Sequence, residues 1–252
     1  MKNYHTHTTR CMHAIGTEEE YIFAALSAGY TELGFSDHTP WHYDSGYHAT
    51  MRMDESQLED YVHTLSVLRD KYKDKISIKI GLECEYFEDK MDWFKEQLET
   101  YKLDYIILGN HFDGSDETGI YYGYPVSLEE LKRYVSQVIK AMDTGLFSYV
   151  AHPDVVFYDE KNQEHIDELE KICIHAAEID MPLEFNLLGY KAMRHYPSQP
   201  FIDLCKKHHN RIIIGTDAHE PGALSDAKTY NRAYTYLKES GLEITEDIKM
   251  LR

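Results

Sequence analysis

Short hydrophobic segments recur along this chain, and most of them end at a histidine or an acidic residue. Residues 76–80 alternate apolar and polar side chains, as a strand does, and lead into Glu83, whereas residues 104–108 lead into His111. Segments with helical periodicity, such as residues 55–72, separate these hydrophobic segments. About seven strand–loop–helix units of this kind predict an α/β fold with a parallel barrel.

The same pattern predicts where the individual elements lie. Thr17 and Glu20 have the spacing of a capping box, so we expect a helix to begin there and to end at Gly29. The expected strands are residues 2–5, 32–36, 76–80, 104–108, 147–150, 183–186 and 212–214. The further expected helices are residues 55–72, 91–98, 127–144, 164–179 and 201–208. We expect these elements to form a single domain over residues 1–252.

Six of the seven expected strands end in residue types that bind metal ions. Active sites of parallel barrels lie at the C-terminal ends of the strands, so these side chains are expected to converge. The candidates are His5, His7, His13, His38, Glu83, His111, His152, Asp217 and His219. They exceed what one tetrahedral ion can bind, so the sequence predicts at least two ions.

The segment His5-Thr6-His7 places two of these candidates two residues apart. Side chains alternate in an extended segment, so His5 and His7 point to the same face. An isolated pair of this kind is usually a pair of surface histidines, but the other candidates favour a metal site. Glu83 or Asp217 can bridge two ions, which a neutral imidazole cannot. Such clusters activate water and bind phosphoryl oxygens, and without thiolate ligands Zn²⁺, Mn²⁺, Fe²⁺ and Co²⁺ are all compatible.

The composition narrows the classes of function. A formal net charge of −18 argues against a broad nucleic-acid or anionic-membrane surface, which needs clustered Lys and Arg. The four cysteines are scattered without a CxxC pair, so neither a disulfide framework nor a thiolate zinc site is indicated. No segment is typical of a signal peptide or a membrane span, and we expect a cytoplasmic protein.

Six motifs along the chain occur in the order found in one known family: HTHTTRCMH, SDH, GLECEY, GNHFDG, AHPD and GTDAH. On these motifs the chain resembles the polymerase and histidinol phosphatase (PHP) family over essentially its whole length. The resemblance implies a distorted (β/α)₇ barrel that holds three divalent metal ions at the C-terminal ends of its strands, with Zn²⁺ the expected metal.

The resemblance also implies how the ligands divide among the three ions. The first ion is expected to be held by His5, His7, Glu83 and Asp217. The second is expected to be held by Glu83, His111 and His152. The third is expected to be held by His13, His38 and His219. Many family members have an acidic residue where this chain has His13, and a histidine there remains compatible with a trinuclear site.

Within the family, the chain is most similar to the monofunctional histidinol-phosphate phosphatases. This similarity rests on the size of the chain, the absence of an appended polymerase domain, and the segments GLECEYFED, GNHFDG and LLGYKAMRHYPS. The resemblance implies hydrolysis of L-histidinol phosphate, a small phosphomonoester of histidine biosynthesis. Two alternatives stay open: a phosphodiesterase or exonuclease that acts on small diesters or nucleic-acid ends, and a metal-stabilised interaction module without activity.

Several further residues are candidates for contact with the substrate. Arg194 follows the one expected strand that brings no metal ligand, and its guanidinium could bind a phosphate through two hydrogen bonds. Arg10 and His42 are alternative substrate-binding residues near the ligands. His195 could donate a proton to the leaving group, beside catalytic roles for Glu83 and Asp217. For Arg194 the competing interpretation is a surface ion pair, and for Arg10 it is a side chain that points outward.

Overall fold

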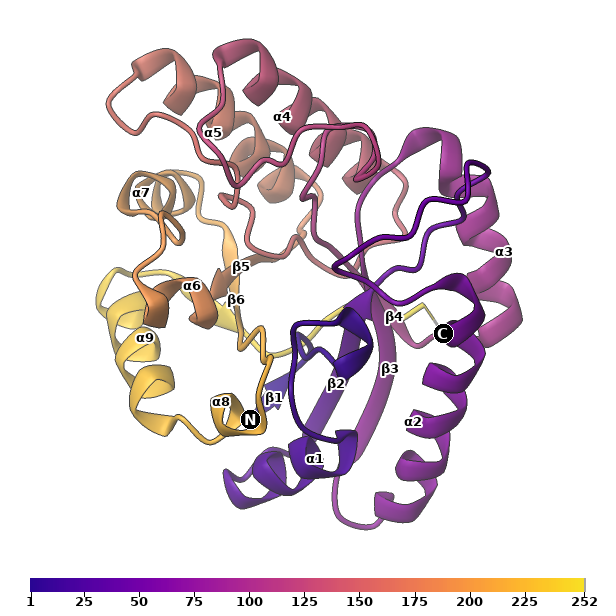
Figure 1. Cartoon of the computed structure of the whole chain (residues 1–252). Helices are drawn as coiled ribbons and strands as arrows, with labels where there is room; N and C mark the ends of the chain where they lie inside the picture. Colours follow the sequence, from indigo (N-terminus) through magenta and orange to yellow (C-terminus); the bar gives the residue numbers. More distant parts are fainter. Residues whose placement is uncertain (252) are drawn as a thin grey trace.

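The computed structural model of the chain describes residues 1–251 and contains parallel strands that curve around a common centre (Figure 1). Strands β1 to β4 form one sheet in sequence order, and β5, β6 and β7 form a second. Every pair of neighbours is parallel, so the C-terminal ends of the strands lie at one edge. The strands are β1 Lys2–Asn3, β2 Glu32–His38, β3 Ser77–Cys84, β4 Tyr105–Leu108, β5 Leu183–Asn186, β6 Arg211–Gly215 and β7 Glu243–Thr245.

Isolated bridges join the two sheets into a ring. Val150 pairs with Leu108 at the end of β4 and with Leu183 at the start of β5. On the other side Thr6, just after β1, pairs with Ala218, just after β6. The ring therefore closes through single bridges rather than through full strands, which makes the barrel irregular.

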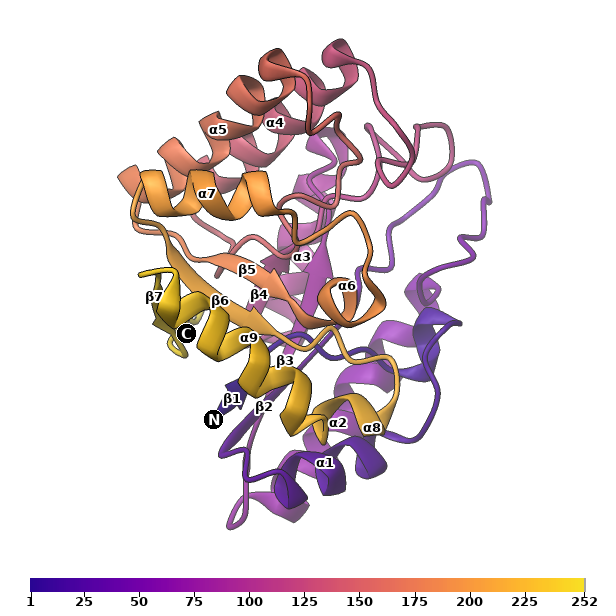
Figure 2. The same ribbon diagram turned by 90° about the vertical axis from the view of Figure 1, so that its left-hand side faces the viewer.

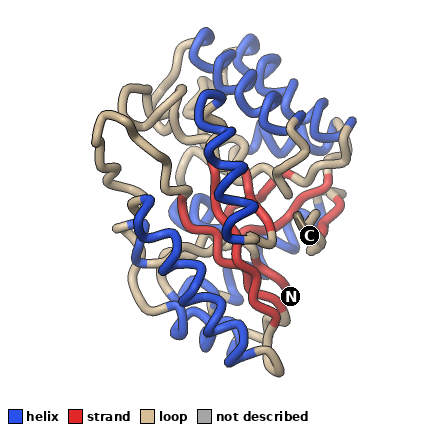
Figure 3. Tube along the Cα trace, turned by 90° about the vertical axis from the view of Figure 1, so that its right-hand side faces the viewer, coloured by secondary structure: helices blue, strands red, loops and turns tan. Residues whose placement is uncertain are grey.

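Helices cover the outside of the curved sheet (Figures 2 and 3). They are α1 Glu18–Ser27, α2 Leu58–Tyr72, α3 Met91–Tyr101, α4 Leu128–Asp143, α5 Gln163–Glu178, α6 Leu187–Ala192, α7 Gln199–Lys207, α8 Pro221–Leu224 and α9 Ala227–Glu239. The predicted capping box is present, because Thr17 accepts a hydrogen bond from the Glu20 backbone and the Glu20 carboxylate accepts one from Thr17. None of the helices in residues 1–251 combines the length and the apolar character needed to cross a lipid bilayer.

Two parts of the expected pattern were wrong. The strand expected at residues 147–150 is not a strand, and only the bridges of Val150 remain. A last strand, β7, and a long helix, α9, follow the final motif, where the sequence pattern predicted neither. The expected α/β fold with a curved parallel sheet is confirmed, but its seven units are not all regular.

The core has an outer and an inner part. Ile106 and Leu108 of β4 pack outward with the helices, whereas Tyr105 and Ile107 pack into a smaller cluster inside the ring. The Tyr105 ring fills the space beside the neighbouring strands, and a Cβ at Gly34 would come within 2.3 Å of its hydroxyl. The inner cluster therefore closes the floor of the barrel on the side away from the C-terminal strand ends.

Candidate metal centre

The structure brings all nine predicted ligand residues to the C-terminal edge of the sheet. Most of them line a cavity of about 240 Å³. Register explains part of the convergence, because His38 at the end of β2 lies directly opposite Glu83 in β3. A Cβ at Gly109 would come within 1.9 Å of the Glu83 carboxylate, so glycine is required there to make room for it.

Glu83 lies at the centre of the cluster, is only 1% exposed, and presents its two carboxylate oxygens to different histidines. Its Oε2 atom lies 3.5 Å from Nε2 of both His5 and His7, and 3.0 Å from Nδ1 of His38. Its Oε1 atom lies 2.8 Å from Nε2 of His152 and 3.4 Å from Nε2 of His111. This two-sided arrangement is the geometry of a carboxylate that can bridge two ions.

Four side-chain atoms have the spacing of ligands to one ion: Glu83 Oε2, Asp217 Oδ1, and the Nε2 atoms of His5 and His7. Asp217 Oδ1 lies 3.5 Å from Nε2 of His5 and 3.3 Å from Nε2 of His7. Ligands about 2.0–2.1 Å from one tetrahedral ion stand about 3.3 Å from each other. All four atoms are buried and lack a hydrogen-bond partner within residues 1–251. Buried polar atoms without partners are costly, so the residues present fit a bound cation.

The charges of the cluster shift its pKa values strongly. Burial alone would raise the pKa of Glu83, but the nearby His111, His38 and His5 outweigh burial and hold it well below its usual range. Burial likewise would lower the pKa of His5, but Glu184, Asp217 and Glu83 raise it well above the usual value. The carboxylates are therefore ionised, and protons compete with metal ions for the histidines.

Glu184 of β5 orients two of these histidines, a role that the sequence pattern did not predict. It is buried, and one oxygen lies 2.7 Å from His5 Nδ1 while the other accepts a 2.8 Å bond from the His152 backbone N–H. The Asn186 amide donates to both Glu184 and Asp217, at 2.9 and 3.1 Å. The expected strand 183–186 brings no metal ligand of its own. Its acidic residue, Glu184, instead positions ligands that belong to other parts of the ring.

Glu85 plays the corresponding part for His111, whose Nδ1 atom lies 3.2 Å away. The GLECEY motif contains this second acidic residue, so its spacing was a signal that could have been used. Glu85 in turn forms two hydrogen bonds, of 2.6 and 2.9 Å, with the fully buried Arg52 guanidinium. Arg52 also binds Asp116 at 2.8 Å, which links the loop after β2 to the loop after β4.

His13 and His219 form a more exposed rim beside the buried cluster. Their Nε2 atoms lie 3.0 Å apart, and His219 Nδ1 lies 3.3 Å from Asp217. The Cys11 thiol lies within 4.8 Å of ligand atoms of both histidines. Burial would raise the pKa of this thiol, but hydrogen bonds with His13, His219 and His7 outweigh it and lower the pKa to about 5. The scattered cysteines of the sequence did not predict a thiol at this position.

Comparison with known proteins identifies the family. The profile of the PHP domain matches residues 3–187, which is most of the chain. The chain belongs to the PHP family.

Curated relatives of this PHP domain are similar over most of its length. A probable histidinol-phosphatase from Deinococcus radiodurans is 29% identical over 229 residues, which cover 86% of each chain. The histidinol-phosphatase of Bacillus subtilis is 28% identical over 250 residues, covering 86% of this chain and 93% of the relative.

A solved structure is similar to this PHP domain in its fold. The histidinol phosphate phosphatase of Lactococcus lactis, in complex with zinc, L-histidinol and phosphate, has a TM-score of 0.75 at 20% sequence identity. The match covers 100% of this chain and 98% of that one. It confirms the predicted PHP-type α/β fold, although not an exact count of seven units.

Among the predicted substrate residues, Arg194 lines the metal cavity of this PHP domain and Arg10 does not. Arg194 donates a 2.7 Å hydrogen bond to the Tyr196 hydroxyl and has no carboxylate partner in the described chain. Its competing interpretation as a surface ion pair therefore finds no support. Arg10 instead binds Glu18 and, at 2.6 Å, Asp60, so its guanidinium is already paired away from the cavity.

The two other histidines that were predicted to contact substrate also point elsewhere. His42 is exposed and pairs with Glu55 at 2.7 Å, outside the metal cavity. His195 stacks on Phe157, and its Nε2 atom lies 2.7 Å from the Val155 carbonyl. Burial lowers the pKa of His195, which favours the neutral ring, and its Nε2–H group donates a hydrogen bond to the Val155 carbonyl. The structure does not bring either ring into the ligand cluster.

Proposed function

We propose that this PHP domain is a metal-dependent phosphomonoesterase that converts L-histidinol phosphate into L-histidinol and phosphate. The observation that carries the proposal is the Glu83 carboxylate, whose two oxygens face separate sets of histidines and have no hydrogen-bond partner within residues 1–251. The unpaired Arg194 guanidinium beside it supplies a site for an anion. The relatives named histidinol-phosphatase indicate which phosphomonoester to test first.

The proposed ligand sets use all nine residues of the cluster and three ions, with Zn²⁺ the first metal to test. His5, His7, Glu83 and Asp217 would hold the first ion. Glu83, His111 and His152 would hold the second. His13, His38 and His219 would hold the third, with Cys11 near enough to His13 and His219 to influence it.

The divalent ions would supply Lewis-acid activation of water and neutralise charge on the phosphoryl oxygens. The protein side chains contribute orientation and charge. Glu184 and Glu85 fix the ring orientations of His5 and His111 through their Nδ1 atoms. Arg194 would donate hydrogen bonds to the phosphate, and the Tyr196 hydroxyl, which accepts a bond from Arg194, holds its guanidinium beside the cavity.

Metal analysis of the purified protein followed by phosphate-release kinetics tests this function. We expect kcat/KM for L-histidinol phosphate to be far above that for a generic aryl phosphate, and phosphate release to stop after treatment with a chelator. Faster cleavage of a bis-aryl phosphodiester or of single-stranded DNA ends would instead favour a phosphodiesterase. Full metal content without hydrolysis of any of these esters would favour an interaction module.

A further inference from the structure

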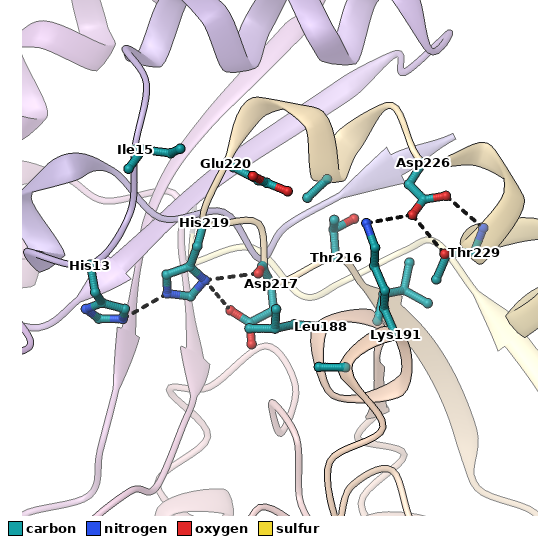
Figure 4. Close-up of a pocket in the computed structure, with 13 residues that line it drawn as sticks. His13, Ile15, Leu188, Lys191, Thr216, Asp217, His219, Glu220, Asp226 and Thr229 are labelled. Atoms are coloured by element: carbon teal, nitrogen blue, oxygen red, sulfur yellow. Dashed lines mark hydrogen bonds and ion pairs between the residues drawn. The ribbon is translucent and has the colours of Figure 1, made fainter.

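A second cavity, of about 540 Å³, adjoins the metal centre (Figure 4). It lies between α6, α8 and the start of α9. His13, Leu188, Asp217 and His219 line both cavities, so these residues form a shared wall. These shared residues place the second cavity directly beside the metal centre, next to a molecule whose phosphate lies at the ions.

Much of the wall of the second cavity is apolar. Leu187, Leu188 and Ala192 of α6 line one side, and Ala223 of α8 lines another. Ile15, at the edge, has 63% of its surface exposed. Metal ions and phosphate gain nothing from apolar walls, whereas a carbon-rich group such as a planar ring is stabilised by contact with them.

The charged groups of the second cavity leave one carboxylate unpaired. The Lys191 ammonium lies 2.9 Å from the Asp226 carboxylate, so these two charges compensate each other. Glu220 lines the same cavity and makes no hydrogen bond or ion pair through its side chain within residues 1–251. In Figure 4 its carboxylate is turned toward the cavity. Glu220 therefore contributes an exposed negative charge that no cationic side chain in the described residues pairs with, and a cationic group of a ligand can neutralise it.

The wall of the metal cavity itself carries a positive charge. It contains the Arg194 guanidinium, which does not line the second cavity and which favours a phosphate and repels a cation. None of the acidic residues in the loop after β4 lines the metal cavity, so they do not offset this charge there. Asp113 lies 2.6 Å from Arg133, and Asp116 lies 2.8 Å from Arg52, so these two carboxylates are also already paired.

We propose that the second cavity binds the leaving group of the phosphomonoester, with Glu220 as the partner of its cationic nitrogen. The inference rests on the proposed phosphatase function and extends it to the chemical class of the alcohol. The occupant is an amino alcohol that carries a planar ring, and L-histidinol has both an amine and an imidazole. The phosphate would face Arg194, and the cationic part would face Glu220 in the second cavity.

The direct test is the change Glu220→Gln, which removes the charge and keeps the shape. We expect KM for L-histidinol phosphate to rise about tenfold, because a hydrogen bond to a charged group is lost. KM for glycerol 1-phosphate, whose alcohol is neutral, should stay unchanged. Glu239→Gln removes one exposed carboxylate at the end of α9 and is the matched control; it should change neither value.

A second variant tests the space rather than the charge. Ala192→Phe places a ring in the cavity from the exposed end of α6. We expect it to weaken the binding of L-histidinol, titrated into zinc-loaded protein in the presence of phosphate. Metal content, measured by elemental analysis, should stay unchanged, because Ala192 contacts none of the proposed ligands.

The outcomes separate the two proposals. If both substitutions leave the preference for L-histidinol phosphate over glycerol 1-phosphate intact, the leaving group lies elsewhere and the assignment of this cavity is overturned. If the unmodified protein releases phosphate from neither ester, the proposed function fails first, whatever the variants do. A loss of the preference in Glu220→Gln, with unchanged metal content, supports both.

Discussion

The buried cluster around Glu83 differs in its construction from the exposed rim, to which Arg194 belongs together with His13 and His219. In the buried cluster, His5, His7 and Glu83 are at most 1% exposed and lie on or next to paired strands. On the rim, His13 and Arg194 are exposed and lie on loops with few partners. Rigid positions suit the ligands around Glu83, and the less constrained position of Arg194 suits a group that meets a substrate that comes and goes.

Removing the negative charge of Glu83 is expected to have the largest effect, because it disrupts the buried cluster itself. Because the carboxylate faces two sets of histidines, Glu83→Gln is expected to lose more than one equivalent of metal and nearly all phosphate release. Elemental analysis and steady-state kinetics measure the two effects. Full metal content with a rate near that of the unmodified protein would show that Glu83 does not bridge ions.

A smaller effect is expected for Glu184→Gln, which keeps the size of a side chain that touches no substrate. Loss of its charge should loosen His5 and His152 and weaken metal affinity by roughly 10- to 100-fold. Competition with a chromophoric chelator measures that affinity. Glu178→Gln, at the exposed end of α5, is the control and should bind metal like the unmodified protein. Equal affinity in both variants would refute a positioning role.

On the rim, Arg194→Ala should change substrate binding and leave the metals in place. One charge-assisted contact is worth roughly 1.5–3 kcal/mol, which corresponds to about a 10- to 100-fold loss of kcat/KM, mainly through KM. Metal content should be unchanged, since Arg194 lies beside the ligands without contacting the bridging carboxylate. An unaltered kcat/KM would return Arg194 to a surface role.

The smallest expected effect is on stability as a function of pH. The pKa values of His5 and His7 lie well above the ordinary value of 6.5 in the metal-free protein, because nearby carboxylates outweigh burial. Their protonated forms stabilise the metal-free fold at low pH, and this contribution is lost as pH rises through the raised pKa values. Metal ions need the neutral rings. The gap in Tm between metal-loaded and metal-free protein should therefore widen above pH 6.5, and a constant gap in calorimetry would contradict this.

The sequence predicted the ligands at the strand ends better than the partners of the loop residues, for a physical reason. A ligand at the end of a hydrophobic strand is marked by the strand itself, so His38, Glu83 and His111 could be placed at one edge from the pattern alone. Glu184 has the same kind of position, but its role depends on which atom of His5 it meets. That requires Glu184 of β5 to meet His5, which is far away in the sequence, and no local pattern encodes such a contact.

The loops were harder to predict because their side chains have many partners to choose from. Arg10 is close to the ligands in sequence, but the carboxylates of Glu18 and Asp60 bind its guanidinium. The segment 147–150 is apolar enough for a strand, but only Val150 pairs with both neighbours. Beyond His219 there was no motif to follow, so α9 and β7 were missed.

The buried Arg52 has a consequence for how a family like this one can diversify. Its guanidinium belongs to the loop after β2 but pairs with Asp116 of the loop after β4 and with Glu85, which orients His111. Grafting a loop after β2 that lacks Arg52 would leave the buried Glu85 carboxylate without its cation, at a cost of about 3–5 kcal/mol, whereas grafting a loop after β4 that lacks Asp116 would leave Arg52 paired with Glu85. The loop after β2 is therefore the more constrained of the two, because its arginine binds carboxylates from two other parts of the fold.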